Sequence, residues 1–377
     1  MKKALLISES SVYRDKSGKI TARGGGEVCF HNIAKSLIKI GIVPTVFAIR
    51  EFEGQVEEEK IEGVLYKRVK VHSRSSFKIV SYLRKAVKQS KDYDYVFVNQ
   101  FSPHLVLPWL KGKKVGVIHD VYRLSGKKFW YKQYGFLRGL MGNFIERLQL
   151  RFDRRYTDKI MTVSDFSEDK ILSVMGDRVV RKIVKNPYPI HIDEYNSKMK
   201  KENFLLFVGR FVDYKHPEHV LHVLREIKPL FPDFKAVFVA ARVENPCLKR
   251  FQKVRKELGL NEEDIILKRN CDSEEVKDLF SRAKVFIQPS YMEGQGIVIL
   301  ESLASGTPVL AYDLPAYSGM IRKNKNSVLA EKGKIGKLSK GLIEILNNYE
   351  KFHKNCGVSP ADFSEKRFLE QMRKICN

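Results

Sequence analysis

The sequence has few cysteines, and none is arranged as a structural site. Its five cysteines (Cys29, Cys247, Cys271, Cys356 and Cys376) lie far apart among 377 residues, without a C-x-x-C pair or a paired histidine spacing. An odd number of scattered cysteines is typical of a reducing compartment. We therefore expect neither a disulfide framework nor a structural zinc.

Long apolar runs are also lacking. No stretch reaches the roughly 18 apolar residues that a membrane-spanning helix needs. The opening MKKALLISES has a short apolar run that breaks at Ser8, Glu9 and Ser10, so it predicts a first strand rather than a signal peptide. We expect a cytoplasmic protein that meets a membrane only peripherally, at its cytoplasmic face.

Acidic residues are scarce. The chain has 44 acidic and 69 basic residues, which gives a net charge of +25. Such a surface attracts nucleic acid, acidic membranes or phosphorylated substrates. The basic residues are spread through both halves and no nucleic-acid-binding module is recognisable, so we expect no nucleic-acid partner and keep a basic nucleic-acid-binding protein as the weaker alternative.

Short β-branched runs alternate with amphipathic helical stretches along the whole chain. The stretch 27–40 has helical apolar spacing that Gly41 ends, and the polar, proline-containing stretch 185–203 predicts a linker. This alternation is typical of α/β domains with parallel, doubly wound sheets, and we expect one at 1–188 and a second at 189–360. The expected strands are 3–8, 43–49, 64–71, 93–99, 114–120 and 159–165, then 204–210, 235–241, 264–270, 284–290 and 308–313.

Two basic side chains follow the first strand of the second domain. Arg210 ends the strand, and Lys215 precedes a helix that Pro217 opens. Ligands of doubly wound sheets bind beyond the carboxyl ends of the strands. A guanidinium beside an ammonium suits the oxygens of a diphosphate there. The alternative is a pair of solvated basic residues.

Two glutamates flank an apolar stretch in the same domain. Glu293 lies in the loop YMEGQG with Gly294 and Gly296, and Glu301 lies eight residues later in a helix that begins near Ile297. The free N–H groups at the start of this helix form an anion site. The glutamates lie at most about 12 Å apart at helical rise, so each carboxylate can accept hydroxyl groups from one end of a nucleotide-sugar. A structural helix-start glutamate with a surface glutamate is the alternative.

The first domain has its own candidate site residues. Gly24, Gly25 and Gly26 follow the first strand and precede a helix, but they do not form the dinucleotide pattern G-x-G-x-x-G. His119 and Asp120 stand at the carboxyl end of a strand. The glycines allow close approach of a phosphate or sugar, and a flexible turn and a capping aspartate are the structural alternatives.

Together these stretches resemble the retaining GT-B glycosyltransferases of family 4 (glycosyl transferases group 1), which include mannosyl-, glucosyl- and N-acetylglucosaminyltransferases. The resemblance follows the chain in order through GGGE, VIHD, VSDFS, VGRFVDYK, SYMEGQGIVILESLASGTPVLAYD and DFSEKRFLEQM. The linker departs from the family pattern, because KNPYP keeps Asn186 but not the usual glycine after it.

The resemblance implies two Rossmann-like domains facing across a cleft, with a C-terminal helix (361–377) crossing back to the first. It implies hexose transfer from a GDP- or UDP-sugar to a glycan or lipid-linked acceptor, with retention and without a metal or other cofactor. Arg210 and Lys215 would bind the diphosphate, Glu293 and His119 the donor sugar, and Glu301 the ribose. Gly294, Gly296 and Ile297 would line the donor site, and Gly25 and Gly26 the phosphate and acceptor side.

A basic aromatic segment, Arg123–Arg155, has nine basic, two acidic and seven aromatic residues. Basic and aromatic side chains side by side suit a helix lying in an anionic membrane interface. An ordinary helix with a solvated face is the alternative. In the family this region often carries acceptor binding, so we expect a lipid-linked acceptor at the cytoplasmic membrane face.

A sugar-nucleotide epimerase or a glucan phosphorylase-like enzyme of the same architecture is the rival enzyme class. The combination of Arg210 with Lys215 and of Glu293 with Glu301 favours transfer. An epimerase would form the epimer from the nucleotide-sugar without any acceptor, which distinguishes the two.

Transfer should not depend on a divalent metal. The Arg210–Lys215 pair supplies positive charge for the diphosphate, and no Asp-x-Asp metal motif stands in a suitable loop. We expect the transfer rate to persist in excess EDTA. Loss of transfer that Mg²⁺ or Mn²⁺ restores would contradict this prediction.

Overall fold

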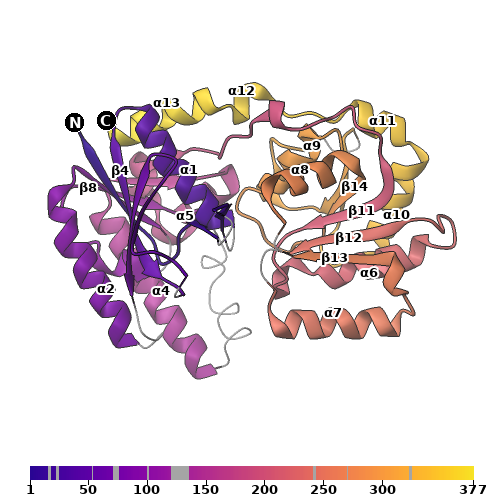
Figure 1. The fold of residues 1–377 in the computed structure, drawn as a ribbon, viewed down its shortest axis with the longest axis horizontal. Helices are drawn as coiled ribbons and strands as arrows, with labels where there is room; N and C mark the ends of the chain where they lie inside the picture. Colours follow the sequence, from indigo (N-terminus) through magenta and orange to yellow (C-terminus); the bar gives the residue numbers. More distant parts are fainter. Residues whose placement is uncertain are drawn as a thin grey trace. The chain divides into compact units, whose positions relative to one another are not determined.

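The chain folds into two compact units, Met1–Tyr188 together with Lys366–Asn377, and Pro189–Glu365 (Figure 1). The computed structural model describes residues 1–15, 18–22, 25–52, 54–70, 76–99, 102–119, 136–240, 243–269, 271–321 and 325–377. Gly24, Asp120 and the first part of the basic aromatic segment lie outside these residues.

The N-terminal unit is built on one sheet with the strand order β10-β9-β8-β7-β1-β4-β6-β5. All neighbouring strands pair in parallel except β5, which lies antiparallel to β6 at the edge. A separate antiparallel hairpin joins β2 to β3. The strands are β1 (Lys3–Ile7), β2 (Tyr13–Arg14), β3 (Ile20–Thr21), β4 (Val43–Arg50), β5 (Glu58–Ile61), β6 (Val64–Lys70), β7 (Tyr95–Asn99), β8 (Lys113–Val117), β9 (Lys159–Thr162) and β10 (Ile183–Lys185).

The helices of this unit begin and end at local sequence signals. Gly41, with φ of +83°, follows α1 in the left-handed conformation that commonly ends a helix. Ser164 caps α5 and forms a capping box with Ser167, a structural role that accounts for the motif VSDFS. The helices are α1 (Gly25–Lys39), α2 (Ser76–Gln89), α4 (Phe136–Tyr156), α5 (Asp165–Met175) and α13 (Glu365–Cys376).

The C-terminal helix α13 packs into the N-terminal unit. Its apolar face buries Phe368, Met372 and Ile375. The Tyr95 hydroxyl donates to the carbonyl of Cys376 at 2.5 Å. The expected C-terminal segment 361–377 therefore belongs to the N-terminal unit only from Lys366 onward.

The C-terminal unit has a parallel sheet with the order β13-β12-β11-β14-β15-β16. The chain runs outward from β11 in one direction and then outward from β14 in the other. The β11/β14 pair is therefore the topological switch point, where doubly wound sheets bind ligands. The strands are β11 (Glu202–Val208), β12 (Lys235–Ala240), β13 (Ile265–Arg269), β14 (Ala283–Gln288), β15 (Val309–Tyr312) and β16 (Ser327–Ala330).

Helices cover this sheet around an aromatic core. Phe207, Phe211, Phe238 and Phe251 contact one another with ring centroids 4.9–5.9 Å apart. Each fully buried aromatic side chain contributes about 1.5–3 kcal/mol to folding. The helices are α6 (Pro217–Ile227), α7 (Asn245–Glu257), α8 (Ser273–Arg282), α9 (Ile297–Ala304), α10 (Ile335–Asn347), α11 (Tyr349–Lys354) and α12 (Pro360–Phe363).

Helix α10 packs closely on the sheet through Gly341. A Cβ at this position would stand 2.7 Å from Val328 Cγ1 and 3.0 Å from Leu310 Cδ1. We expect Gly341→Ala to destabilise the protein by about 1–3 kcal/mol, because the core must shift to admit the methyl group. Gly336→Ala on the same helix is the control, since nothing lies within 4 Å of its Cβ position. Denaturant unfolding measures both, and equal effects would contradict the packing.

Candidate functional site

The candidate residues of the C-terminal unit gather at its switch point. Arg210 and Lys215 follow β11, and Glu293 follows β14, the strand paired with β11. Parallel strands bring their carboxyl ends to the same edge of a sheet, so these two loops lie side by side. The sheet order therefore joins the segments that sequence analysis singled out separately.

Lys215 and Glu293 form a buried ion pair. The Lys215 ammonium lies 2.5 Å from Glu293 Oε1, and the side-chain amide of Gln288 donates to the same oxygen at 2.6 Å. Both charged residues are more than nine-tenths buried. Removing one partner would leave an uncompensated buried charge, so the pair fixes both loops. An ammonium has three N–H donors, and Lys215 can therefore hold Glu293 and a ligand oxygen together.

Tyr214 links the two loops and holds the second cation. Its hydroxyl accepts a hydrogen bond from the Arg210 guanidinium, which lies 5.9 Å from the centre of the Tyr214 ring. Its backbone carbonyl accepts the N–H of Tyr291 at 2.8 Å. The loop after β14 is thereby tied by its backbone to the turn that carries Lys215.

Helix α9 begins beside Glu293. Gly296 precedes it with φ of +84°, and a Cβ there would stand 3.0 Å from the Tyr317 ring, so this position requires glycine. Gly294 lies in the same loop, and Ile297 is the first residue of the helix. The first N–H groups of a helix have no partners within it, which makes this end an anion site.

Buried polar atoms around Glu293 lack hydrogen-bond partners within the described residues. These atoms are Gln288 Oε1, Ser290 Oγ and the Tyr317 hydroxyl. Burial raises the pKa of Tyr317 well above its usual value, and the nearby charge of Glu293 raises it further. Buried polar atoms without partners are uncommon in folded proteins. The three atoms near Glu293 have hydrogen-bonding capacity that is available to a polar ligand.

Glu301 has a different environment. Its Oε1 accepts the hydroxyl hydrogen of Tyr195 at 2.9 Å. Burial raises the pKa of the Glu301 carboxyl above its usual value, and the Tyr195 hydrogen bond and the charge of Lys277 oppose this shift. The two glutamates thus have separate partners, and among the described residues only Glu293 is paired with a cation by direct contact.

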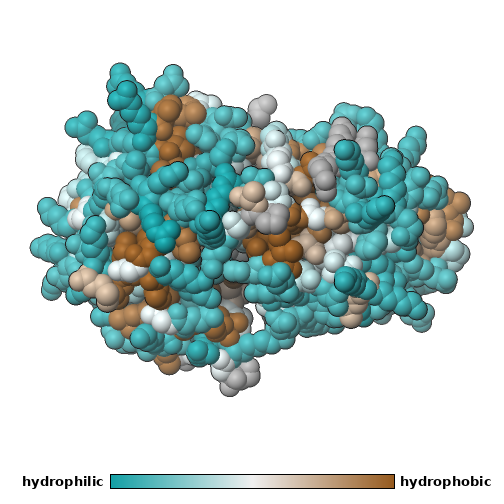
Figure 2. All heavy atoms as spheres, turned by 90° about the horizontal axis from the view of Figure 1, so that it is seen from above, coloured by the Kyte–Doolittle hydropathy of each residue, from teal (hydrophilic) through white to brown (hydrophobic). Residues whose placement is uncertain are grey.

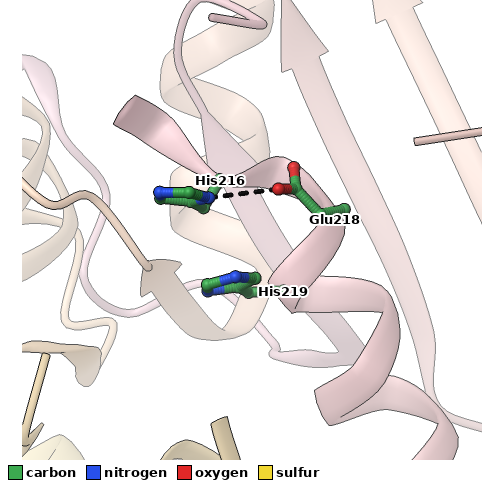
Figure 3. A group of neighbouring side chains, drawn as sticks. All are labelled: His216, Glu218 and His219. Atoms are coloured by element: carbon green, nitrogen blue, oxygen red, sulfur yellow. Dashed lines mark hydrogen bonds and ion pairs between the residues drawn. The ribbon is translucent and has the colours of Figure 1, made fainter. Parts of the chain in front are cut away.

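His216, Glu218 and His219 form a compact group whose potential metal ligand atoms lie within 4.8 Å of one another (Figure 3). The histidine rings stack at 4.5 Å with 15° between their planes. A metal bonds in the plane of an imidazole, and these nearly parallel planes do not converge on one point. The Glu218 carboxylate also accepts a hydrogen bond from Arg250 at 2.9 Å, which already neutralises it. The arrangement does not fit a metal.

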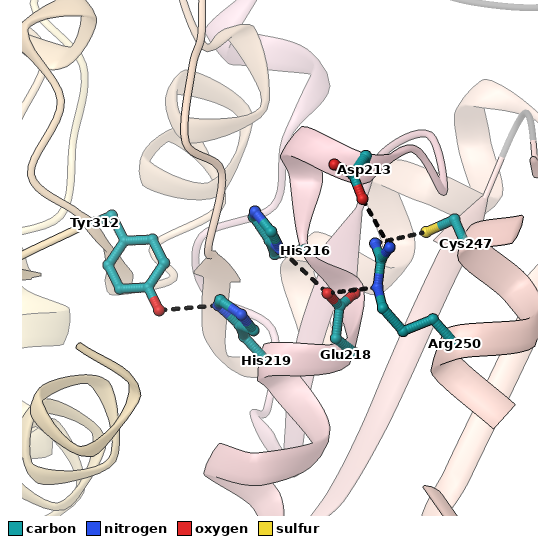
Figure 4. Close-up of polar contacts among 7 residues, drawn as sticks. All are labelled: Asp213, His216, Glu218, His219, Cys247, Arg250 and Tyr312. Carbon is teal, nitrogen blue, oxygen red and sulfur yellow. Dashed lines mark hydrogen bonds and ion pairs between the residues drawn. The ribbon is translucent and has the colours of Figure 1, made fainter. Parts of the chain in front are cut away.

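The same residues belong to a network that holds the Lys215 turn (Figure 4). Arg250 donates to Glu218 and, at 2.6 Å, to Asp213, which begins the 3₁₀ turn Asp213–Lys215. His219 contacts the Tyr312 hydroxyl at 2.9 Å, and burial is the main cause that lowers the pKa of His219 to about 4. A neutral His219 adds no charge to the stack. The network therefore positions the turn rather than a cofactor.

In the N-terminal unit the structure brings His119 and Gly26 together. A Cβ on Gly26 would stand 3.4 Å from His119 Nε2. The glycine cluster was expected before the helix, whereas α1 begins at Gly25, so Gly25 and Gly26 form its first turn. Their N–H groups are among those without partners inside the helix. His119 follows β8 and is partly buried.

Sequence reasoning did not single out the tyrosines of these sites. Tyr188, Tyr195 and Tyr214 each hold a candidate residue by their hydroxyl groups: His119, Glu301 and Arg210. Tyr214 had a signal, since it lies between Arg210 and Lys215 in the quoted motif. Tyr188 and Tyr195 lie in the expected linker, where no local pattern marked them.

Two family descriptions match nearly the whole chain. Residues 191–358 match "Glycosyl transferases group 1". Residues 23–187 match "Glycosyltransferase Family 4". In the part of the chain that the structure describes, no helix combines the length and apolar character needed to cross a membrane.

The chain is similar to glycosyltransferases over most of its length. It is 24% identical to an uncharacterised glycosyltransferase of Methanocaldococcus jannaschii, covering 91% of this chain and 90% of that one. It is also 24% identical to an α-1,4-N-acetyl-D-galactosaminyltransferase of Campylobacter jejuni named for a PP-undecaprenol acceptor, covering 93% and 94%.

Among solved structures, Anabaena HepE in complex with UDP and glucose matches with a TM-score of 0.78. The match covers 100% of this chain and 99% of that one at 15% identity, so it bears on the fold alone. The family matches, the relatives and this fold agree. The chain is therefore a glycosyltransferase whose two halves match the Family 4 and group 1 descriptions, and it has the GT-B fold, with a Rossmann-like unit around each sheet.

Proposed function

We propose that the protein transfers a hexose from a GDP- or UDP-sugar to a hydroxyl group of a glycan or lipid-linked acceptor, with retention at the anomeric carbon. The Lys215–Glu293 contact of 2.5 Å carries this proposal. It places a cation suited to a phosphate oxygen directly beside a carboxylate suited to sugar hydroxyl groups. A sugar diphosphate has these two groups on either side of one bond.

The remaining residues fit the same ligand. Arg210 and the first N–H groups of α9 share the diphosphate charge with Lys215, and Glu301 accepts hydroxyl groups of the ribose. UDP in the HepE structure supports a nucleotide donor. The same positive groups provide the stabilisation of the leaving diphosphate that a metal supplies in other enzymes.

Retention requires substitution on the face from which the diphosphate leaves. In the proposed step the acceptor oxygen bonds to the anomeric carbon as the bond to the diphosphate oxygen breaks. A phosphate oxygen of the leaving group takes the acceptor hydroxyl proton. Arg210 and Lys215 stabilise the charge that develops on the diphosphate, so their contribution is greatest in the transition state.

A lipid-linked acceptor is favoured by helix α4, whose first half exposes large apolar side chains. Hydrophilic residues cover most of the protein face shown in Figure 2. Helix α4 instead exposes a row of large apolar side chains and buries polar ones. The exposed row is Phe136, Leu137, Leu140, Met141 and Phe144, and the buried polar row is Asn143, Glu146, Gln149 and Asp153.

Basic residues continue the exposed row toward the C-terminal end of α4. Arg147, Arg151, Arg154 and Arg155 are all exposed. Apolar side chains that enter a lipid interface beside arginines that bind anionic headgroups are typical of interfacial helices. Each arginine near an anionic leaflet contributes about 1 kcal/mol. We therefore propose that α4 docks the enzyme peripherally on an anionic membrane surface, with the acceptor in that membrane, and that this surface is the cytoplasmic face.

Substituting the two glutamates should change different kinetic parameters. Glu301→Gln should chiefly raise the donor KM, because a ribose contact is similar in the ground and transition states. Glu293→Gln should chiefly lower kcat, because it acts at the reacting sugar. Arg210→Ala should lower kcat by about 10² or more, since it removes charge stabilisation from the leaving group. Steady-state kinetics measures all three, with Arg282→Ala as the control for losing a surface arginine that pairs with Glu202.

Melting at two pH values separates a binding role of Glu301 from a structural one. The pKa of this carboxyl is raised in the folded protein, so its favourable contribution to folding is lost as pH rises through that pKa. Glu301→Gln should melt no lower than wild type at pH 7.5, and the difference should shrink near pH 4.5. If Glu293→Gln and Glu301→Gln both melt at a lower temperature than wild type and keep normal kinetics when folded, the two carboxylates are structural.

The exposed row of α4 should bind anionic vesicles. Wild type should sediment with vesicles that contain phosphatidylserine at low salt and less at high salt, because headgroup attraction is screened. Changing Leu137, Met141 and Phe144 to serine should remove most binding. The control changes Leu230, Ile266 and Val174, which are exposed apolar residues elsewhere, to serine. Equal loss in both triple variants, or no binding at low salt, would contradict membrane docking.

A further inference from the structure

Tyr188 lies where the chain leaves the N-terminal unit, in the segment where this sequence departs from the family pattern. Its hydroxyl lies 3.2 Å from His119 Nδ1, and the residue is only 3% exposed. The ring packs against Phe368 of α13 with centroids 5.9 Å apart, and the Asn186 amide donates to the Phe368 carbonyl. The packing of the ring holds the Tyr188 hydroxyl oxygen beside His119.

A second buried group contacts the same hydroxyl. Cys29 of α1 is hydrogen-bonded to Tyr188 and is itself buried. Burial raises the pKa of Tyr188 well above its usual value, and Cys29 raises it further, so the phenol keeps its proton at physiological pH. The hydroxyl therefore has a single hydrogen to donate, and among the contacts of the described residues His119 and Cys29 are neighbours that can take it.

The chemistry of the neighbours decides where this hydrogen goes. A neutral imidazole nitrogen is a good acceptor, whereas a thiol sulfur is a weak one and can donate its own hydrogen. The arrangement that suits these three groups runs from Cys29 S–H to the Tyr188 oxygen and from Tyr188 O–H to His119 Nδ1. His119 then carries its ring proton on Nε2.

We propose that Tyr188 is a positioning residue that holds His119 in the tautomer with the proton on Nε2. Nε2 is the atom on the side of Gly26, in the first turn of α1. In this tautomer an imidazole N–H and the first N–H groups of α1 point to the same region. This inference rests on the proposed function, because the group that they serve is an oxygen of the donor or acceptor.

The tautomer can be observed directly in the full-length protein. With ¹⁵N-labelled histidine, NMR distinguishes protonated from unprotonated ring nitrogens, and His119→Gln assigns the His119 signals. At pH 8 we expect Nε2 to carry the proton in wild type and a mixture of tautomers in Tyr188→Phe, which keeps the ring but loses the hydroxyl. A wild-type proton on Nδ1, or an unchanged tautomer in Tyr188→Phe, would overturn the proposal.

Cys29→Ala tests the direction of the hydrogen bonds. If the thiol donates to Tyr188, its removal leaves the His119 tautomer unchanged. If the tyrosine instead donates to sulfur, its removal frees the hydroxyl and moves the histidine proton, which would contradict the proposal.

Kinetics tests the consequence for transfer. Tyr188→Phe should lower kcat by on the order of tenfold, with little change in the KM for the nucleotide-sugar, and it should alter the pH profile of kcat. The reason is that a misplaced imidazole N–H weakens the binding of the transition state. Tyr95→Phe is the matched control, since it removes a buried tyrosine hydroxyl that contacts the Cys376 carbonyl of α13 and not His119. Equal effects of the two variants would mean that Tyr188 is only structural. If no nucleotide-sugar supports transfer, the proposed function fails, while the NMR result still decides the role of Tyr188.

Discussion

The site of the C-terminal unit depends on the ion pair between Lys215 and Glu293, which are 78 residues apart in the chain. Each charge alone would be costly to bury, and the pair is stable only while both loops keep their places. The β11/β14 pairing brings these loops to one edge of the sheet. The backbone hydrogen bond from the Tyr291 N–H to the Tyr214 carbonyl then fixes the position of one loop against the other. Sheet topology, loop conformation and ligand chemistry therefore converge on one contact.

Hydroxyl groups of tyrosines perform the same task in both units. Tyr195 holds Glu301, Tyr214 holds Arg210, and Tyr188 contacts His119. A rigid aromatic ring places one polar atom at the end of a buried, well-packed body, so it orients a charged or titratable side chain without adding a charge. Such tyrosines fix the positions of the candidate site residues. This matters most for residues on loops, which secondary structure does not hold in place.

Helix α4 shows how composition and structure answer different questions. The segment 123–155 has the charge and aromatic content of an interfacial helix, yet a helix with a solvated face has the same composition. We base the interfacial proposal on the exposed Phe136, Met141 and Phe144. Apolar groups cost free energy in water, so an exposed row of them is understandable if it meets a lipid surface. The buried Asp153 on the opposite side of α4 is held within the protein by His104, with 2.6 Å between Asp153 Oδ1 and His104 Nδ1.

Local rules acting over a few residues were enough to predict the alternating strands and helices, the end of α1 just before Gly41, the start of α6 at Pro217 and the glycine before α9. They also marked Arg210 and Glu293 as polar groups after strands. They could not predict that α1 begins within the glycine cluster, or that Tyr188 reaches His119. Those contacts depend on strand order and helix packing, which bring together residues separated by tens of positions. Backbone preference and hydrophobic period are properties of neighbouring residues, whereas the partners of a buried charge or hydroxyl are set by the folded chain as a whole.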